Sequence, residues 1–184
     1  MRRLAERLDV GTMTLYGYFP SKRELLHGVL DAAVADRSGA PEPGEGWRPQ
    51  LSALVGLARR NMLRHPALVE IRVREPVLRP EALRMSEEAL RILLGAGFTS
   101  REAAQAFRLL FTYSFGFAAF SPADTVDQDR AAARAAIAAL APDEYPALTG
   151  AAAEAVEAMG GEEAFDYGLE RILDGLELRL ADRG

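Results

Sequence analysis

The chain has 184 residues, enough for one or two small domains, and 49% of them are apolar, which allows a substantial core. It has no cysteine and two histidines, which excludes disulfides, thiolate zinc sites and cysteine nucleophiles, so we expect no metal and no cofactor. The net charge is −5, and neither a signal peptide nor an apolar run of the roughly 20 residues that span a membrane is found, so a cytoplasmic protein without membrane contact is predicted.

Residue usage favours helices along the whole chain. Alanine, leucine, glutamate and arginine dominate, whereas period-two runs of valine, isoleucine and threonine are missing. We therefore predict an all-α fold.

Residues 4–22 predict the end of one helix, a tight turn, a very short second helix and the start of a third. Residues 9–11 interrupt the helical pattern, as the turn of a helix-turn-helix requires. Leu15 and Phe19 lie at i, i+4 and are expected to anchor the short helix inward. Because so short a helix has little stability of its own, its neighbours must hold it, and its exposed face is available to a partner.

The exposed face of the short helix suits DNA. Threonine and tyrosine hydroxyls can bond phosphates or base edges, and a methionine can contact a thymine methyl group. Ser21 and Glu24 form a capping box that opens the next helix, whose free amides and dipole favour a phosphate beside Lys22. The alternative is a generic core helical hairpin with a tyrosine-rich surface. The candidate DNA contacts are Arg2, Thr12, Met13, Thr14, Tyr16, Tyr18 and Lys22.

The segment from Leu4 to Leu26 resembles the DNA-binding signature of the TetR family of bacterial transcriptional repressors. The family's signature is a Leu-Tyr pair just before an aromatic residue, then a phenylalanine, a turn and a lysine. It is matched here by Leu15, Tyr16, Tyr18, Phe19, Pro20, Ser21 and Lys22. The match covers about twenty consecutive positions, so it is specific. The family pattern has one more helix before the position of Met1, so the resemblance implies a head whose first helix is missing here.

The charge is distributed unevenly. Residues 1–27 contain five Lys/Arg side chains and three acids, a net charge of +2, so the remaining residues carry −7. A basic head on an acidic body fits DNA binding through one face. Since a charge of +2 is modest, we expect affinity and specificity to need two heads on one palindromic site.

The head is predicted to continue into one helix over residues 22–37, which resembles the family's connecting helix. His27 is expected on its outer side as a surface residue, with a phosphate contact as the alternative. Its apolar stripe is Leu25, Leu26, Val29, Leu30, Ala33 and Val34. The predicted domains are a truncated helix-turn-helix head with its connecting helix at 1–37, a linker at 38–46, and a helical effector-binding and dimerisation domain at 47–184.

The body is predicted to consist of helices joined by short breaks. A capping box of Thr99 and Glu102 opens the helix that ends near Phe120, and residues 142–150 are predicted to be a loop. Hydrophobic periodicity predicts helices over residues 47–64, 66–74, 81–94, 102–120, 127–140, 151–159 and 162–181.

The helix that ends near Phe120 carries aromatic side chains interleaved with hydroxyls. An apolar cavity with a few hydroxyls is the usual form of a small-molecule site between helices, but an aromatic stripe at helical spacing is equally typical of plain core. The candidate pocket residues, on this helix and its neighbours, are Met62, Ile71, Met85, Leu93, Phe107, Leu110, Phe111, Thr112 and Ser114.

The resemblance also bears on the effector. Tetracycline repressors bind a magnesium–drug complex partly through a histidine in the helix matched by residues 109–117. This chain has Thr112 at the equivalent position and no histidine after His65. The resemblance therefore implies an apolar or mixed organic effector rather than a tetracycline–magnesium complex.

The helix predicted at residues 162–181 resembles the closing helix of the tetracycline-repressor branch, which forms a four-helix dimer interface with the helix matched by residues 102–120. Gly168 and Gly175 share one of its faces, and each costs about 1 kcal/mol of helix propensity, which indicates close approach of another helix. The alternative is a core helix packed only within its own chain. The implied interface residues are Phe115, Gly168, Ile172, Gly175 and Leu176.

Three functions follow. The first is a homodimeric repressor that a small organic effector releases from its double-stranded operator. The second is a helical ligand-binding or interaction module whose truncated head no longer binds DNA. The third is an enzyme, for which no nucleophile–base set, metal cluster, phosphate-binding loop or catalytic carboxylate pair stands out.

Overall fold

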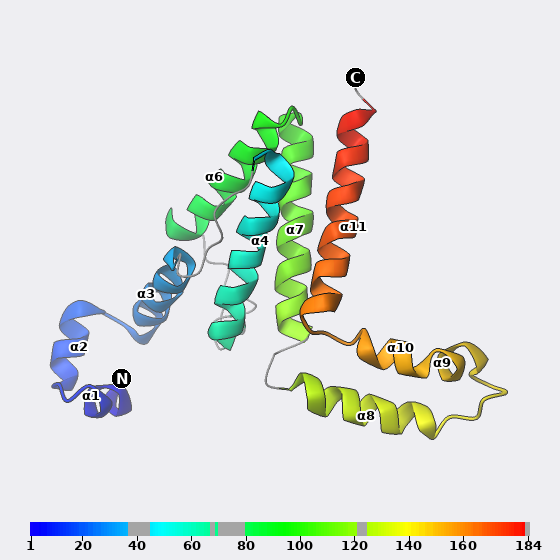
Figure 1. The fold of residues 1–184 in the computed structure, drawn as a ribbon. Coiled ribbons are helices and arrows are strands. Elements are labelled where there is room, and N and C mark those ends of the chain that lie inside the picture. Colours follow the sequence, from blue (N-terminus) through cyan, green and yellow to red (C-terminus); the bar gives the residue numbers. More distant parts are fainter. Residues whose placement is uncertain (37–44, 67–68, 70–79, 121–124, 183–184) are drawn as a thin grey trace.

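The regular structure is helical throughout the part of the chain that the computed structural model describes, residues 1–36, 45–66, 69, 80–120 and 125–182 (Figure 1). The prediction of an all-α fold is confirmed. In chain order the helices are α1 (Arg2–Arg7), α2 (Thr12–Tyr18), α3 (Lys22–Ala35), α4 (Trp47–Arg64), α6 (Pro80–Gly95), α7 (Ser100–Phe120), α8 (Val126–Ala138), α9 (Pro146–Gly150), α10 (Ala152–Glu157) and α11 (Glu162–Ala181).

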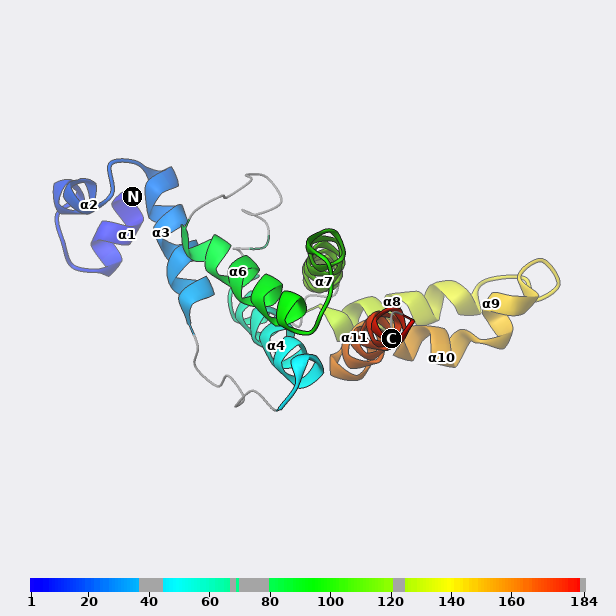
Figure 2. The same ribbon diagram turned by 90° about the horizontal axis from the view of Figure 1, so that it is seen from above.

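The helices form a body with a projection on either side (Figures 1 and 2). In the body, α7 packs against α4, α6 and α11, and α6 also packs against α4. The helix α3 lies against α6 and α4 and leads out to α1 and α2 on one side. On the other side, α8, α9 and α10 form a hairpin that extends away from α7 and α11. The connecting helix α3 is therefore the element that joins the small head to the body.

The core of the body is built where the apolar faces of four amphipathic helices meet. Phe165 and Leu173 of α11, Leu51 of α4 and Leu93 of α6 are almost completely buried there. Burying a side chain of this size stabilises the fold by about 1.5–3 kcal/mol. The core cluster also contains Leu54, Val55, Ala89, Ile92, Phe98, Ala103, Ala106, Leu110 and Leu169.

The capping and periodicity signals place most helix bounds correctly. The helices α4 and α11 begin and end at the predicted residues, and α6 and α7 begin and end within two residues of theirs. At the start of α7, the backbone N–H of Thr99 donates to Glu102 Oε2 (3.0 Å) and the N–H of Glu102 donates to Thr99 Oγ1 (3.4 Å). This reciprocal pair is the predicted capping box.

The loop predicted at residues 142–150 is wrong in its second half. Pro146 begins the short helix α9, because a proline has the backbone angle of a first helical residue and needs no N–H there. The Thr149 hydroxyl donates to the carbonyl oxygen of Tyr145 (2.8 Å) and closes this turn. The linker predicted at 38–46 and the helix predicted at 66–74 lie mostly outside the described residues.

The prediction that His27 is a surface residue is also wrong. Its side chain is only 15% exposed, whereas Val29, which was expected to face inward, is 46% exposed. The buried face of α3 runs through His27, Leu30 and Ala33 at three-residue spacing, because α3 packs against both α4 and α6. The periodicity predicted the helix correctly but assigned the wrong residues to part of its buried face.

Among the described residues, none of the helices is both long and apolar enough to span a membrane. The same residues contain no group of three or more His, Cys, Asp or Glu side chains placed to hold a metal ion.

Candidate functional site

A few buried side chains hold α1, α2 and the start of α3 together in the head. Ala5 of α1 is buried against α2, and Leu15 is the buried residue of α2. Asp9 takes a left-handed backbone conformation (φ 52°) in the turn between the two helices, which aspartate tolerates better than most residues. Phe19 lies against Gly28 of α3, where a Cβ atom would come within 2.9 Å of the ring. The inward anchors Leu15 and Phe19 are therefore placed as their spacing predicts.

The opposite face of α2 is open to solvent. Met13 is 82% exposed and Tyr18 is 77% exposed, while Thr14 and Tyr16 are also exposed and Thr12 is half-buried. The helix α2, which carries these residues, lies with α1 at one end of the molecule (Figure 1). Such a face can be inserted into a DNA groove without unfolding any part of the body.

Two cationic side chains flank this face. Lys22 is exposed at the first position of α3, directly after Ser21, whose Oγ accepts a hydrogen bond from the N–H of Glu24 (3.1 Å). The start of α3 thus combines a helix N-terminus with a lysine, which together favour a phosphate. Arg2 is exposed and pairs with Glu6 at 3.2 Å, and an exposed pair of this kind contributes only about 0–1 kcal/mol.

A cavity of about 150 Å³ lies between α3, α4, α6 and α7. Its wall is mostly apolar and includes an aromatic series on α7, in which Phe111 lies 6.1 Å from Phe107 and 5.8 Å from Phe115, ring centre to ring centre. The lining residues are Leu30, Asp31, Ala33, Leu51, Leu54, Val55, Ala58, Asn61, Met62, Val69, Met85, Ala89, Phe107, Leu110, Phe111, Ser114 and Phe115.

Most of the candidate pocket residues lie together in this wall. They are Met62, Met85, Phe107, Leu110, Phe111 and Ser114. Leu93 is fully buried in the core and does not line the cavity, and Thr112 is exposed because it lies one residue past Phe111 and faces away. Ile71 lies outside the described residues.

Sequence reasoning missed the contributions of α3 and Asn61 to the cavity. Leu30, Asp31 and Ala33 line it because α3 leans against α4 and α6, a tertiary arrangement that periodicity does not reveal. Asn61 had a sequence signal: it is a polar residue at i+3 from Ala58, on the apolar stripe of α4. A buried amide in such a stripe needs hydrogen-bond partners and often has a specific role.

The residues expected at the dimer interface lie in three different surroundings. Phe115 lines the cavity, because it continues the four-residue spacing of Phe107 and Phe111. Gly168 lies under Tyr113 of the same chain, whose hydroxyl donates to the carbonyl oxygen of Phe165 (2.7 Å). Burial raises the pKa of the Tyr113 hydroxyl, which keeps it protonated as the donor at neutral pH.

The remaining three expected interface residues, Ile172, Gly175 and Leu176, lie at or beside the free face of α11. Ile172 and Leu176 are half-buried against the core, whereas a Cβ atom at Gly175 would meet nothing within 4 Å. Around Gly175, α11 exposes Tyr167, Arg171 and Leu178, and the Arg171 guanidinium lies over the Tyr167 ring. These four residues follow one another at helical spacing, which defines the exposed face of α11.

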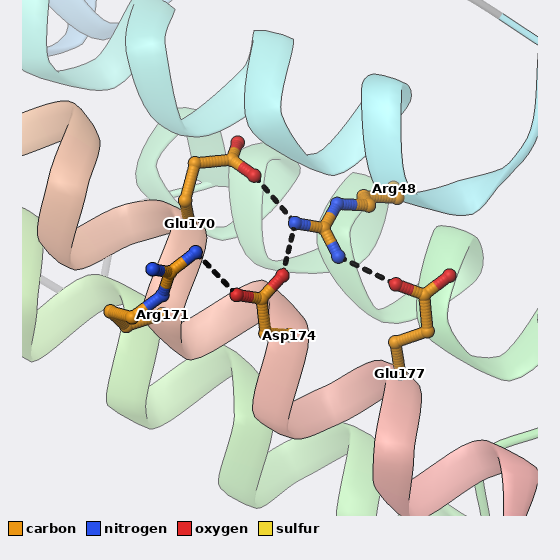
Figure 3. A network of polar contacts seen from close by, with 5 residues as sticks. All are labelled: Arg48, Glu170, Arg171, Asp174 and Glu177. Carbon is orange, nitrogen blue, oxygen red and sulfur yellow. Dashed lines mark hydrogen bonds and ion pairs between the residues drawn. The ribbon is translucent and has the colours of Figure 1, made fainter.

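A cluster of ion pairs joins the adjacent side of α11 to α4 (Figure 3). The Arg48 guanidinium of α4 bonds Asp174 and Glu177 at 2.6 Å each and also Glu170. Arg171 contacts the second oxygen of Asp174. The hydrogen bond that Arg48 donates to Asp174 lowers the pKa of the Asp174 carboxyl and raises the pKa of Arg48.

Comparison with known proteins identifies the family to which both parts of the chain are similar. Residues 1–29 match the family model described as bacterial regulatory proteins, tetR family, and residues 40–180 match the tetracyclin repressor-like C-terminal domain. The transcriptional repressor DrrR1 of Streptomyces coeruleorubidus is 33% identical over 196 residues, which span all of this chain and 71% of that protein. The class A tetracycline repressor of transposon 1721 from Escherichia coli is 32% identical, over 97% of this chain and 81% of that protein.

Solved structures show the same fold. The Streptomyces coelicolor protein ActR in complex with actinorhodin has a TM-score of 0.74 and 26% identity, covering 98% of this chain and 87% of that one. A possible TetR family regulator from the same organism has a TM-score of 0.76 and 27% identity, covering 96% and 88%. The chain therefore belongs to the TetR family of bacterial transcriptional regulators, which are not enzymes.

Proposed function

We propose that this protein is a cytoplasmic, homodimeric repressor that binds a palindromic double-stranded operator and is released from it by a small organic effector. The effector binds in the cavity between α3, α4, α6 and α7. The observation that carries this proposal is the position of α3, because Leu30, Asp31 and Ala33 form part of the cavity wall while the N-terminal end of the same helix bears Lys22 and the head.

The cavity's size supports a mechanical coupling between effector and head. Sites for drug-sized ligands usually have volumes of about 300–1,000 Å³, larger than the 150 Å³ found here. We infer that a ligand of that size displaces part of the wall. The helix α3 is the wall element that also carries the head, so its displacement changes the spacing of two heads in a dimer. The effector shifts this equilibrium only by its higher affinity for the displaced state.

The known ligands of similar proteins support an organic effector. ActR was crystallised with actinorhodin, and an Acinetobacter baumannii TetR variant, 25% identical to this chain, with minocycline. The apolar, aromatic wall of the present cavity suits an apolar or mixed organic molecule. The exposed face of α11 supports pairing of two chains, which would place two copies of α2 on one palindrome.

Operator selection tests the proposal directly. The full chain is incubated with a pool of random double-stranded oligonucleotides, bound DNA is amplified, and binding to the enriched sequence is measured by fluorescence anisotropy. We expect the enriched sequence to be a palindrome whose half-sites lie about one DNA turn or a multiple apart. Actinorhodin is the first effector to be tested, and we expect it to release the protein from this DNA. A chain that enriches no sequence would contradict repressor function, whereas a single half-site would contradict the dimer.

A further inference from the structure

Asn61 connects the cavity to the end of α3. It lies on the inward face of α4, is only 6% exposed, and is one of the residues that line the cavity. Its Nδ2 donates two hydrogen bonds of 2.9 Å, one to the carbonyl oxygen of Ala33 and one to that of Asp36. Both acceptors lie at the C-terminal end of α3, where carbonyls have no partner within the helix. Asn61 therefore caps the helix that carries the head.

The two donated bonds determine how the amide is oriented. Since only the NH2 group can donate to two carbonyls, Oδ1 is the atom turned away from α3. Oδ1 is buried and finds no hydrogen-bond partner among the described residues. A buried acceptor without a partner is unfavourable, so a donor brought by a ligand would be strongly preferred at this point.

The other polar side chains of the described wall are also acceptors. Ser114 Oγ donates to the carbonyl oxygen of Leu110 in its own helix (2.9 Å), so its proton is engaged and its lone pairs remain. The third polar residue is Asp31, whose carboxyl oxygens are also acceptors. Phe111 and Phe115, which also line the cavity, are nearly parallel, with 11° between their ring planes. These rings make this part of the wall aromatic and apolar.

We propose that the cavity selects a flat aromatic molecule bearing a hydrogen-bond donor, such as a phenolic hydroxyl, and that this donor binds Asn61 Oδ1. The inference rests on the proposed function, because it names the ligand class of the same cavity. Asn61 then contacts the ligand through Oδ1 and the end of α3 through Nδ2. Any shift of the amide toward the ligand alters the cap of α3, so one side chain connects ligand recognition to the connecting helix.

A pair of probes of nearly equal shape tests the role of the donor. The full chain is titrated by calorimetry with 2-naphthol and with 2-methylnaphthalene, which lacks the hydroxyl. We expect 2-naphthol to bind about tenfold more tightly, because it alone can donate to Oδ1. In Asn61→Leu the ratio of the two affinities should fall to about one. The control Met62→Leu, in the same wall, should keep the ratio of the unmodified chain. Equal affinities in the unmodified chain, or a preference that persists in Asn61→Leu, would overturn the proposal.

A second measurement does not depend on the folding of that variant. In the ¹⁵N-labelled unmodified chain, 2-naphthol should shift the side-chain amide resonances of Asn61 much more than 2-methylnaphthalene does. Equal shifts, or none, would overturn the proposal. The two hypotheses can be tested separately. If the protein selects an operator and actinorhodin releases it, but the two probes bind equally well, the proposed function is supported and the role of Asn61 is excluded.

Discussion

Two glycines on one face of α11 lie in different surroundings. At Gly168 an added Cβ atom would overlap the hydroxyl end of Tyr113, whereas at Gly175 it would meet nothing within 4 Å. Tyr113 is held in place by its bond to the Phe165 carbonyl and by stacking on the Phe165 ring at 5.2 Å. Gly168 is therefore required by contacts within the chain, and Gly175 is not.

The first prediction concerns Gly168→Ala. The new methyl group should displace Tyr113 and break its hydrogen bond, which outweighs the gain of about 1 kcal/mol in helix propensity and lowers the free energy of unfolding by about 1–2 kcal/mol. Urea denaturation checks this. The matched control is Gly56→Ala in α4, where the nearest atom is 3.5 Å away and the same change should raise stability. Equal stabilisation by both substitutions would contradict the role of Tyr113.

The second prediction concerns the phosphate contact of Lys22. Lys22→Ala should weaken binding to the selected operator about equally for all sequences and reduce the slope of log K against log salt by about one. Anisotropy titrations at several salt concentrations measure the slope. Arg101, exposed at the start of α7 in the body, serves as the control, and Arg101→Ala should leave the slope unchanged. An unchanged slope in Lys22→Ala would remove this residue from the interface.

At the scale of elements, α3 is restrained at both ends. Its first turn is capped by Ser21, and its last turn is held by Asn61 and by the ion pair between Arg64 and Asp36. Both Asn61 and Arg64 lie in the last turns of α4. The orientation of the connecting helix thus depends on a few polar contacts at its end, in addition to the apolar contacts around the cavity.

The third prediction concerns the contact between α4 and α11. Arg48→Met should lower the thermal midpoint at pH 7 by about 2–4 °C, because three carboxylates on one face of α11 lose their common partner. Arg171→Met, which removes an exposed pair within α11, should have a smaller effect. Differential scanning calorimetry compares the two variants. A larger loss in Arg171→Met would contradict the assignment.

The same contact has a pH dependence. The pKa of Asp174 is lowered in the fold, chiefly by the hydrogen bond from Arg48, so its stabilisation is complete above the ordinary value of 3.8 and is lost as pH falls through the lowered pKa. The unmodified chain should therefore lose more stability between pH 5 and pH 2 than Arg48→Met does. Equal losses would show that Asp174 is not coupled to Arg48.

At the scale of the whole molecule, the head and the hairpin of α8, α9 and α10 project on opposite sides of the body (Figure 2). Between them, α11 has one side attached to α4 through Arg48 and another that exposes Tyr167, Gly175 and Leu178. Leu178 is 68% exposed on this side. It is the face that the proposed dimer would use.

The fourth prediction concerns association. Gly175→Trp should convert a dimer to a monomer in sedimentation velocity experiments, because the indole would fill the space between two closely packed helices. Gly95→Trp, at the exposed end of α6 where nothing lies within 4 Å, is the matched control and should remain dimeric. If the Gly175→Trp chain stays dimeric, the interface lies elsewhere.

Features that depend on neighbours within about four residues could be predicted from the sequence. The capping box of Thr99 and Glu102, the bounds of α4 and α11, and the inward anchors Leu15 and Phe19 follow from local hydrogen bonds and helical periodicity. The aromatic series on α7 was visible for the same reason. The family resemblance could also be recognised from the sequence, because the turn, the short helix and the cap lie within one continuous segment.

Which helix faces meet could not be predicted from the sequence, because it depends on contacts between distant segments. The burial of His27 and the contribution of α3 to the cavity depend on how α3 leans on α4 and α6. Asn61 caps α3 because its side chain donates a hydrogen bond to the carbonyl oxygen of Ala33, which lies 28 residues earlier in the chain. The same holds for Gly168, which needs the approach of Tyr113. Such contacts join residues that are distant in sequence, and the spacing within one helix carries no information about the orientation of the next.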